Sequence, residues 1–158
     1  MRIGHGFDAH RLVDGRRFVL GGVEIPFERG ALGHSDADAL AHAVCDALLG
    51  AAALGDLGAH FPDTEAEWKD ADSMVLLARC VELVRYAGFG VENVDATIIL
   101  QHPKLAPHIA DMRRRLAEVM RVQLGQVSVK AKTSEGMGYT GDGTGVAVHA
   151  VACLHTID

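Results

Sequence analysis

The sequence predicts an α+β fold, a single-domain sandwich in which helices cover one face of a mixed β-sheet. Strand-like alternation stands near both ends of the chain, helical spacing of apolar residues stands between them, and one further β-rich segment separates the second helix from the third. This order is typical of helices stacked on one side of a sheet. With 158 residues, 49% of them hydrophobic, the chain suits one core, so we expect one domain over residues 1–158.

The first part of the chain alternates as strands do. Residues 3–10 and 17–27 are predicted strands, and the glycine pair at 21 and 22 indicates a bulge or a tight bend. From Ser35 onwards apolar residues recur at helical spacing, which predicts a first helix with Ser35 as its N-cap. Residues 47–54 form the longest apolar stretch, which is too short to span a bilayer.

The second part of the chain begins with a loop over residues 55–65. A second helix is predicted from Asp72, its cap, to Gly88, its stop. Residues 94–100 are β-rich and apolar, as a central strand is, and a third helix follows Pro107. Alternation predicts the last strands at residues 127–132 and 146–154.

Composition limits the classes of partner and compartment. The formal net charge of −6 argues against a nucleic-acid surface, which needs clustered Lys and Arg. Cys45, Cys80 and Cys153 are odd in number and lie in apolar surroundings, so we expect reduced thiols in a reducing compartment, the cytoplasm. The N-terminus lacks the apolar segment of a secretion signal and the length of a transit peptide. We therefore expect no membrane anchor and a mature chain that starts at Met1.

A divalent-metal site is predicted from Asp8, His10 and His42. Side chains two residues apart on a strand leave the same face, and a carboxylate beside an imidazole suits zinc or a similar cation. His42 would add a third ligand from the first helix, leaving one coordination position open for a group such as a phosphate oxygen.

A different interpretation of the same helix stays open. His34, Asp38 and His42 recur every four residues and would form a polar stripe, in which Asp38 and Asp46 could orient ligating imidazoles or face water. Equally, acidic residues are favoured near a helix N-terminus, and a core histidine can be satisfied by hydrogen bonds alone. The segment at residues 130–136, which ends a strand in a polar turn, is also ambiguous. Its lysine, hydroxyls, amides and carboxylate suit a phosphate chain with a second metal ion, but an ordinary turn at the end of a strand has the same composition.

Six motifs, in this order, closely resemble the 2-C-methyl-D-erythritol 2,4-cyclodiphosphate synthase family over nearly the whole chain. They are Gly6-Phe7-Asp8-Ala9-His10, Gly33-His34-Ser35-Asp36-Ala37-Asp38, Asp46-Ala47-Leu48-Leu49-Gly50, Gly55-Asp56-Leu57-Gly58, Phe61-Pro62-Asp63-Thr64 and Lys132-Thr133-Ser134-Glu135.

The resemblance implies a cyclising phosphorus–oxygen lyase of the non-mevalonate isoprenoid pathway. Such an enzyme converts 4-diphosphocytidyl-2-C-methyl-D-erythritol 2-phosphate into the 2,4-cyclodiphosphate and releases CMP. It also implies zinc at Asp8, His10 and His42, and a magnesium or manganese ion placed with the help of Glu135. A homotrimer with active sites between adjacent subunits is expected as well.

The resemblance further implies the roles of site residues. His34 and Thr133 match transition-state stabilisers, and Ser35 matches a neighbouring substrate contact. The remaining substrate contacts are Asp8, Ala9 and His10; the methylerythritol loops, Asp56, Leu57, Gly58, Phe61, Pro62, Asp63, Thr64 and Glu65; the cytidine-diphosphate pocket, Leu100, Gln101, His102, Pro103, Lys104, Leu105, Ala106, Lys132, Thr133, Ser134 and Glu135; and Tyr139 and Asp142.

Three positions depart from the family pattern. Asp142 stands where arginine is frequent, Gly136 where lysine is common, and His102 where a small residue is common. These changes predict altered nucleotide affinity, or compensation by Lys132, with every metal ligand retained.

Two other functions are compatible with a metal site. A zinc-dependent phosphohydrolase or nucleotide deaminase is one, but the chain has neither His-Glu-x-x-His nor His-x-Glu followed by Cys-x-x-Cys. A non-catalytic, metal-stabilised trimer that binds an isoprenoid or a nucleotide is the other.

Overall fold

The computed structural model describes all 158 residues and contains a five-stranded sheet with the order β4-β1-β7-β5-β6. Strands β5 and β6 are parallel and the other neighbours are antiparallel, so the sheet is mixed. The strands are β1 (Arg2–Asp14), β4 (Arg29–Ala31), β5 (Phe89–Ile99), β6 (Val127–Lys132) and β7 (Gly145–Thr156), with a separate hairpin of β2 (Phe18–Leu20) and β3 (Val23–Ile25). The helices are α1 (Ala39–Ala51), α2 (Leu57–His60), α3 (Ser73–Tyr86), α4 (Ile109–Met120) and α5 (Gly138–Gly141), with short 3₁₀ turns at Ala66–Trp68, Ala106–His108 and Leu124–Gln126.

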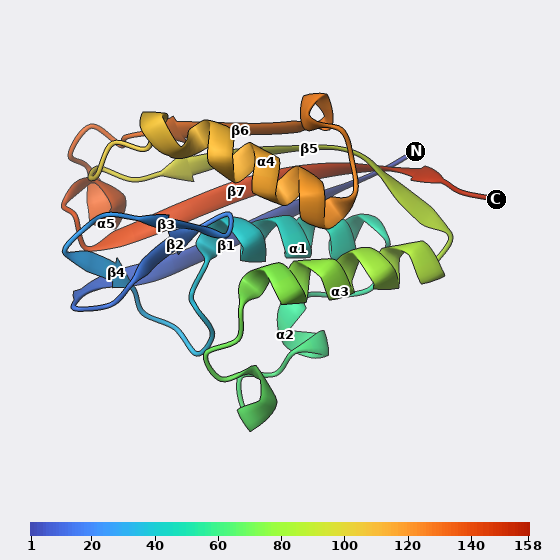
Figure 1. Cartoon of the computed structure of the whole chain (residues 1–158), viewed down its shortest axis with the longest axis horizontal. Helices are drawn as coiled ribbons and strands as arrows, with labels where there is room; N and C mark the ends of the chain where they lie inside the picture. The colour runs from blue at the N-terminus through green and yellow to red at the C-terminus, as the bar shows by residue number, and fades with distance from the viewer.

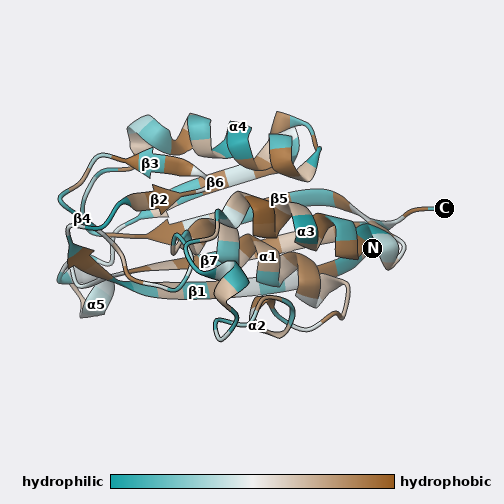
Figure 2. Ribbon diagram, turned by 60° about the horizontal axis from the view of Figure 1, so that its bottom comes forward, coloured by the Kyte–Doolittle hydropathy of each residue, from teal (hydrophilic) through white to brown (hydrophobic).

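Helices α1, α3 and α4 lie in front of the sheet in Figure 1 and cover one of its faces. A core cluster of 39 buried residues fills the space between these layers. Along α4, hydrophobic and hydrophilic stretches alternate, as expected of a helix with one buried face (Figure 2). The predicted α+β architecture is therefore confirmed. None of the helices is long and apolar enough to cross a membrane.

Two glycines of β1 allow α1 to lie directly against the sheet. A Cβ atom at Gly4 would come within 2.0 Å of the Ala47 carbonyl oxygen, and one at Gly6 within 1.8 Å of the Ala43 carbonyl oxygen. Side chains at even positions of β1 thus face α1, while Ile3 and Phe7 are exposed on the opposite face. Asp8 and His10 continue the row of these glycines, so they too lie on the side of α1.

The segment at residues 17–27 is not one continuous strand, but the tight bend predicted at its glycine pair is confirmed. It is the β2–β3 hairpin, and Gly21 and Gly22 form its turn with φ values of 60° and 71°, a conformation that glycine adopts without strain. The short strand β4 was not predicted, because its three residues pair only with the end of β1. The third helix and the strand at residues 127–132 are confirmed.

The N-cap of α1 is Asp38, and the prediction of Ser35 is wrong. Asp38 accepts hydrogen bonds from the amides of Ala41, Gly21 and Gly22, which links the helix to the hairpin turn. Ala37 has a left-handed conformation at φ 57°, so the helix cannot begin before this residue.

All three cysteines are free thiols, as predicted. Cys45 and Cys80 are buried between α1 and α3, and burial raises the pKa of the Cys45 thiol well above its usual range. The Cys45 thiol is therefore not a reactive nucleophile.

Candidate metal centre and substrate clefts

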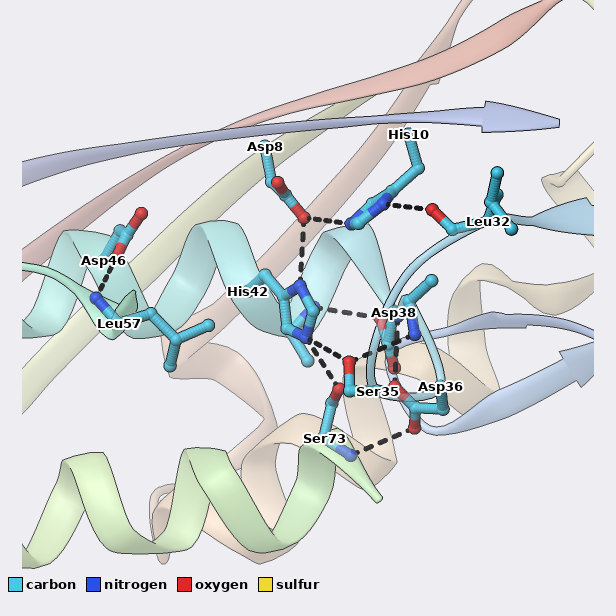
Figure 3. A network of polar contacts seen from close by, with 12 residues as sticks. Asp8, His10, Leu32, Ser35, Asp36, Asp38, His42, Asp46, Leu57 and Ser73 are labelled. Carbon is cyan, nitrogen blue, oxygen red and sulfur yellow. Dashed lines mark hydrogen bonds and ion pairs between the residues drawn. The ribbon is translucent and has the colours of Figure 1, made fainter. Parts of the chain in front are cut away.

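The side chains of Asp8, His10 and His42 point toward one another (Figure 3). Asp8 and His10 come from β1, and His42 comes from the first turn of α1. One ligand atom from each lies within 4.8 Å of the other two. The structure thus brings the three predicted ligands together across the contact between strand and helix.

Hydrogen-bond partners fix which ring nitrogens face the centre. His10 Nδ1 lies 2.9 Å from the Leu32 carbonyl oxygen, which can only accept, so Nδ1 carries a proton. His10 Nε2 faces Asp8 Oδ2 at 2.8 Å, with a proton in the charged ring and a lone pair in the neutral ring. His42 Nδ1 faces the same oxygen at 3.1 Å, and its Nε2 lies 2.9 Å from Ser73 Oγ.

Charge at this centre is shared between the carboxylate and the imidazoles. Burial raises the pKa of Asp8, but the hydrogen bonds and charges of His10 and His42 outweigh burial and lower it to about 2. For His10, burial lowers the pKa, while the hydrogen bond and charge of Asp8 and the Leu32 carbonyl raise it above 6.5 overall. The carboxylate is therefore ionised at neutral pH and attracts positive charge into the space between the rings.

This donor set fits a divalent cation. When both rings are neutral and His10 carries its proton at Nδ1, lone pairs of the two rings and of Asp8 Oδ2 converge on one point, which suits a cation. One carboxylate and two imidazoles are typical ligands of zinc, and three protein ligands leave room for a substrate oxygen.

The predicted polar stripe along the helix is wrong. His34 precedes α1, and the fully buried Asp38 points to the hairpin amides, so it neither orients an imidazole nor faces water. Burial raises the pKa of Asp38 to about 6 although three amides oppose that rise. Asp46 accepts a hydrogen bond of 2.7 Å from the Leu57 amide, which ties the following loop to α1.

A cleft of about 500 Å³ lies beside the three ligands. His34 lines this cleft, and its Nε2 atom lies 3.2 Å from the Glu65 carbonyl oxygen. Trp68 also lines it and packs edge-on against Phe61 with ring centroids 5.0 Å apart. The sequence interpretation missed Trp68, although the only tryptophan, on a polar loop, was a usable signal. Of the predicted residues, Ser35, Leu57, Gly58, Phe61, Pro62, Asp63 and Thr64 line this cleft as well.

A second cleft, of about 430 Å³, is formed by the loop after β5 and the end of β6. The amide of Gly136 donates to Gln101 Oε1 at 3.3 Å, which joins the turn after β6 to that loop. Its lining comprises the predicted residues Leu100, Gln101, His102, Pro103, Lys104, Leu105, Ala106, Lys132 and Thr133, together with Ile109 and Ala131, which were not predicted.

The two clefts share no residue and lie on different strands. Asp8 is opposite Val148, which is opposite Ile98, which is opposite Ala131. Three steps between strands separate the metal ligands from the end of β6, which is roughly 14 Å at about 4.8 Å a step. Thr133 and Glu135 therefore do not meet the metal ligands within one chain.

Other predicted contacts have local structural partners. Asp56 caps α2 by accepting from the Ala59 amide at 2.9 Å. Asp142 accepts from the Thr144 hydroxyl at 2.6 Å and from the Thr144 amide at 2.9 Å, and these hydrogen bonds lower its pKa. Arg29 donates to the Gly143 carbonyl at 2.8 Å, so a cation does lie next to position 142. The predicted contacts that line neither cleft are Asp8, Ala9, Asp56, Glu65, Ser134, Glu135, Tyr139 and Asp142.

Comparison with known proteins agrees with these features. A protein of Salinibacter ruber named 2-C-methyl-D-erythritol 2,4-cyclodiphosphate synthase is 58% identical over 156 residues, which covers 99% of both chains. One of the same name from Trichlorobacter lovleyi is 57% identical over 98% of both chains. A solved structure of a synthase of this name with CDP bound superposes with a TM-score of 0.90 at 40% identity, over 98% of this chain and 100% of that one. Residues 1–155 match the YgbB family, and the protein is therefore a member of this family, as the resemblance of its motifs predicted.

Proposed function

We propose that this protein converts 4-diphosphocytidyl-2-C-methyl-D-erythritol 2-phosphate into 2-C-methyl-D-erythritol 2,4-cyclodiphosphate and CMP, in isoprenoid precursor biosynthesis. The observation that carries the proposal is the cluster of Asp8, His10 and His42 beside a cleft lined by His34. The relatives that bear the synthase name match 98–99% of the chain, which supports the same conclusion.

The reaction needs placement more than it needs a base. An oxygen of the 2-phosphate forms a bond to the β-phosphorus, and the bond from that phosphorus to the bridging oxygen breaks, so CMP leaves with the bonding electrons. Because the attacking phosphate is already anionic, the protein has to align the groups and stabilise the charge that develops.

Two divalent cations belong to the proposal. Asp8, His10 and His42 would hold zinc, and Glu135 would help to hold magnesium or manganese at the substrate diphosphate. A bound cation supplies Lewis-acid polarisation of phosphate oxygens.

The chain's own groups then divide the remaining tasks. His34 and the Thr133 hydroxyl would donate hydrogen bonds to developing charge, and Lys132 would attract the diphosphate. In the first cleft, Phe61 and Trp68 exclude water while Asp63 can accept from substrate hydroxyls.

An active site assembled from two copies of the chain follows from the distance between the clefts. If the diphosphate must reach both the metal ligands and Thr133, a second copy has to bring its nucleotide cleft to the first copy's metal centre. A homotrimer is the form that we propose for this assembly. A cytoplasmic location is supported by the three free thiols.

The test is incubation of metal-loaded protein with the cytidine-linked methylerythritol phosphate, with CMP release and phosphorus NMR of the product followed together. CMP with a cyclic diphosphate is the expected result. CMP with a linear product would mean that water replaces the internal phosphate, as in a phosphohydrolase. Absence of reaction in an intact, zinc-loaded oligomer would indicate a binding protein.

His42→Ala separates the metal centre from the rest of the fold. We expect zinc stoichiometry to fall and CMP release to collapse, because one of three protein ligands is lost. The matched control is His155→Ala, which removes an exposed imidazole paired with Glu92. This variant should keep the wild-type zinc stoichiometry and the wild-type rate of CMP release. Zinc binding and turnover that survive in His42→Ala would refute the assignment of this ligand.

A further inference from the structure

A polar chain continues behind the metal centre, away from the cleft. Ser73, the first residue of α3, is fully buried, and its Oγ lies 2.9 Å from His42 Nε2. The same hydroxyl donates to Asp36 Oδ1, and the Ser73 amide donates to Asp36 Oδ2 at 2.9 Å. Figure 3 shows this series from Asp8 through His42 and Ser73 to Asp36.

The direction of each hydrogen bond in this chain is fixed by the number of protons. An ionised carboxylate can only accept, so the single hydroxyl proton of Ser73 is committed to Asp36. Ser73 Oγ can then only accept from His42, and the proton of a neutral His42 ring must be on Nε2. The Nδ1 lone pair is left facing Asp8 and the centre.

Asp36 is itself held in place by the backbone. It accepts from the Asp38 amide at 3.1 Å and from the Ser73 amide, so the carboxylate cannot turn away from the hydroxyl. Ser35 Oγ also lies 3.2 Å from His42 Nε2. This oxygen accepts a hydrogen bond from the Ala37 amide, but no carboxylate beside it orients the hydroxyl proton. The serine of α3 is thus the partner that determines the tautomer.

We propose that Ser73 and Asp36 are positioning residues that keep the His42 proton on Nε2 and so present Nδ1 to a metal ion, a role that rests on the metal site proposed above. The segment before α1 and the start of α3 would then jointly set the affinity of the centre. Partners behind a metal-binding histidine typically change metal affinity about 10- to 100-fold.

The test measures zinc affinity by competition with a chelator in wild type, Ser73→Ala and Ser73→Thr. We expect Ser73→Ala to bind zinc about 10- to 100-fold more weakly, and Ser73→Thr to recover much of that loss because the hydroxyl is kept. Ser128→Ala, a change of the same kind on the exposed side of β6, is the control and should bind as wild type does.

A second readout reports on the ring itself. In ¹H–¹⁵N spectra of the zinc-saturated wild type, the His42 Nε2 proton should be downfield and slow to exchange, because it donates to a buried oxygen. In Ser73→Ala this proton should move upfield and exchange quickly, while the backbone amide spectrum stays folded. A change in packing alone would not restore the signal in Ser73→Thr.

The outcomes are distinct. Equal zinc affinity in wild type and Ser73→Ala overturns the positioning role while leaving the metal site and the proposed reaction intact. If Ser73→Thr loses as much zinc affinity as Ser73→Ala, the positioning role is also overturned, because keeping the hydroxyl would then make no difference. Wild-type protein that binds no zinc overturns the metal site and this role together.

Discussion

Asp8 determines the electrostatics of the metal centre, because both imidazoles approach the same carboxylate oxygen. His10 Nε2 is 2.8 Å and His42 Nδ1 is 3.1 Å from Asp8 Oδ2. A carboxylate at such a distance favours the protonated form of an imidazole, and it does so here against the opposing effect of burial. Asp8 therefore raises the pKa of His10 in the metal-free protein, as a cation-attracting group at the centre of the site does.

Asp8→Asn should lower the pKa of His10 in metal-free protein. Removing the carboxylate leaves burial, which favours the neutral ring, as the main influence on a group whose pKa is raised above 6.5 in wild type. Titration of the His10 ring protons by NMR after treatment with a chelator measures this directly. The control is Asp46→Asn, which changes a carboxylate that accepts a hydrogen bond from the Leu57 amide and should leave the pKa of His10 as it is in wild type. An unchanged His10 pKa in Asp8→Asn would contradict the assigned cause.

Asp142 tests the effect of charge near the proposed phosphate site. Asp142→Arg should lower the Michaelis constant, because a negative charge next to an anionic substrate is replaced by a positive one. Asp142→Asn keeps an oxygen for the Thr144 amide and removes only the charge, so it should lower the constant less. Steady-state kinetics decide the matter, and constants equal to wild type in both variants would mean that this charge is irrelevant.

At the scale of elements, the contact between β1 and α1 positions the metal ligands. The glycines of β1 remove the side chains that would separate strand from helix, and Ala43 and Ala47 oppose them on α1. The ligands Asp8 and His10 lie just beyond this contact on the same face of β1. The spacing of the metal centre is thus set by packing of backbone against backbone.

Gly6→Ala should displace α1 and destabilise the protein by about 3 kcal/mol or more, as severe overpacking does. The new Cβ would lie 1.8 Å from the Ala43 carbonyl oxygen, so the helix has to move. Gly50→Ala is the matched control, because its Cβ meets nothing within 4 Å and a helical glycine is replaced, which should stabilise by about 0.5–1 kcal/mol. Urea unfolding of metal-free protein gives both values, and a Gly6→Ala variant as stable as wild type would disprove the close contact.

At the scale of the whole molecule, the sheet separates the two clefts. β7 and β5 lie between β1, which carries two of the proposed metal ligands, and β6, which leads into the second cleft. A reaction that uses both sets of residues on one diphosphate therefore requires two chains to meet. This is the structural basis for the proposed shared site.

Mixing two inactive variants should restore activity if the site is shared. His42→Ala lacks a metal ligand and Thr133→Ala lacks a hydroxyl of the second cleft, so in mixed oligomers some interfaces combine the intact halves. With random exchange of subunits about a quarter of the sites would be intact. The activity of co-refolded mixtures measures this fraction, with each variant refolded alone as the control. Mixed oligomers without activity would argue for a site within one chain.

Much of the fold could be predicted because, in long helices and strands, the period of the apolar residues shows which face is buried. The strand at residues 127–132 has the predicted bounds, the third helix follows Pro107 as predicted, and the mixed sheet with helices on one face follows from the order of the elements. The errors lie where tertiary contacts decide local structure. The cap of α1 is Asp38 because the hairpin turn supplies amides for its second oxygen, and no pattern near Ser35 contains that information.

The sequence by itself determined the family, through six ordered motifs, and it predicted Asp8, His10 and His42 as a ligand set, whose side chains the structure brings together. Only the tertiary structure decided that His34 and Asp38 leave the supposed helical stripe, that Trp68 lines the first cleft, and that Ser73 stands behind His42. It also decided that the two clefts are apart. The physical reason is that spacing along a chain fixes direction within one element, whereas the distance between elements depends on how their surfaces pack.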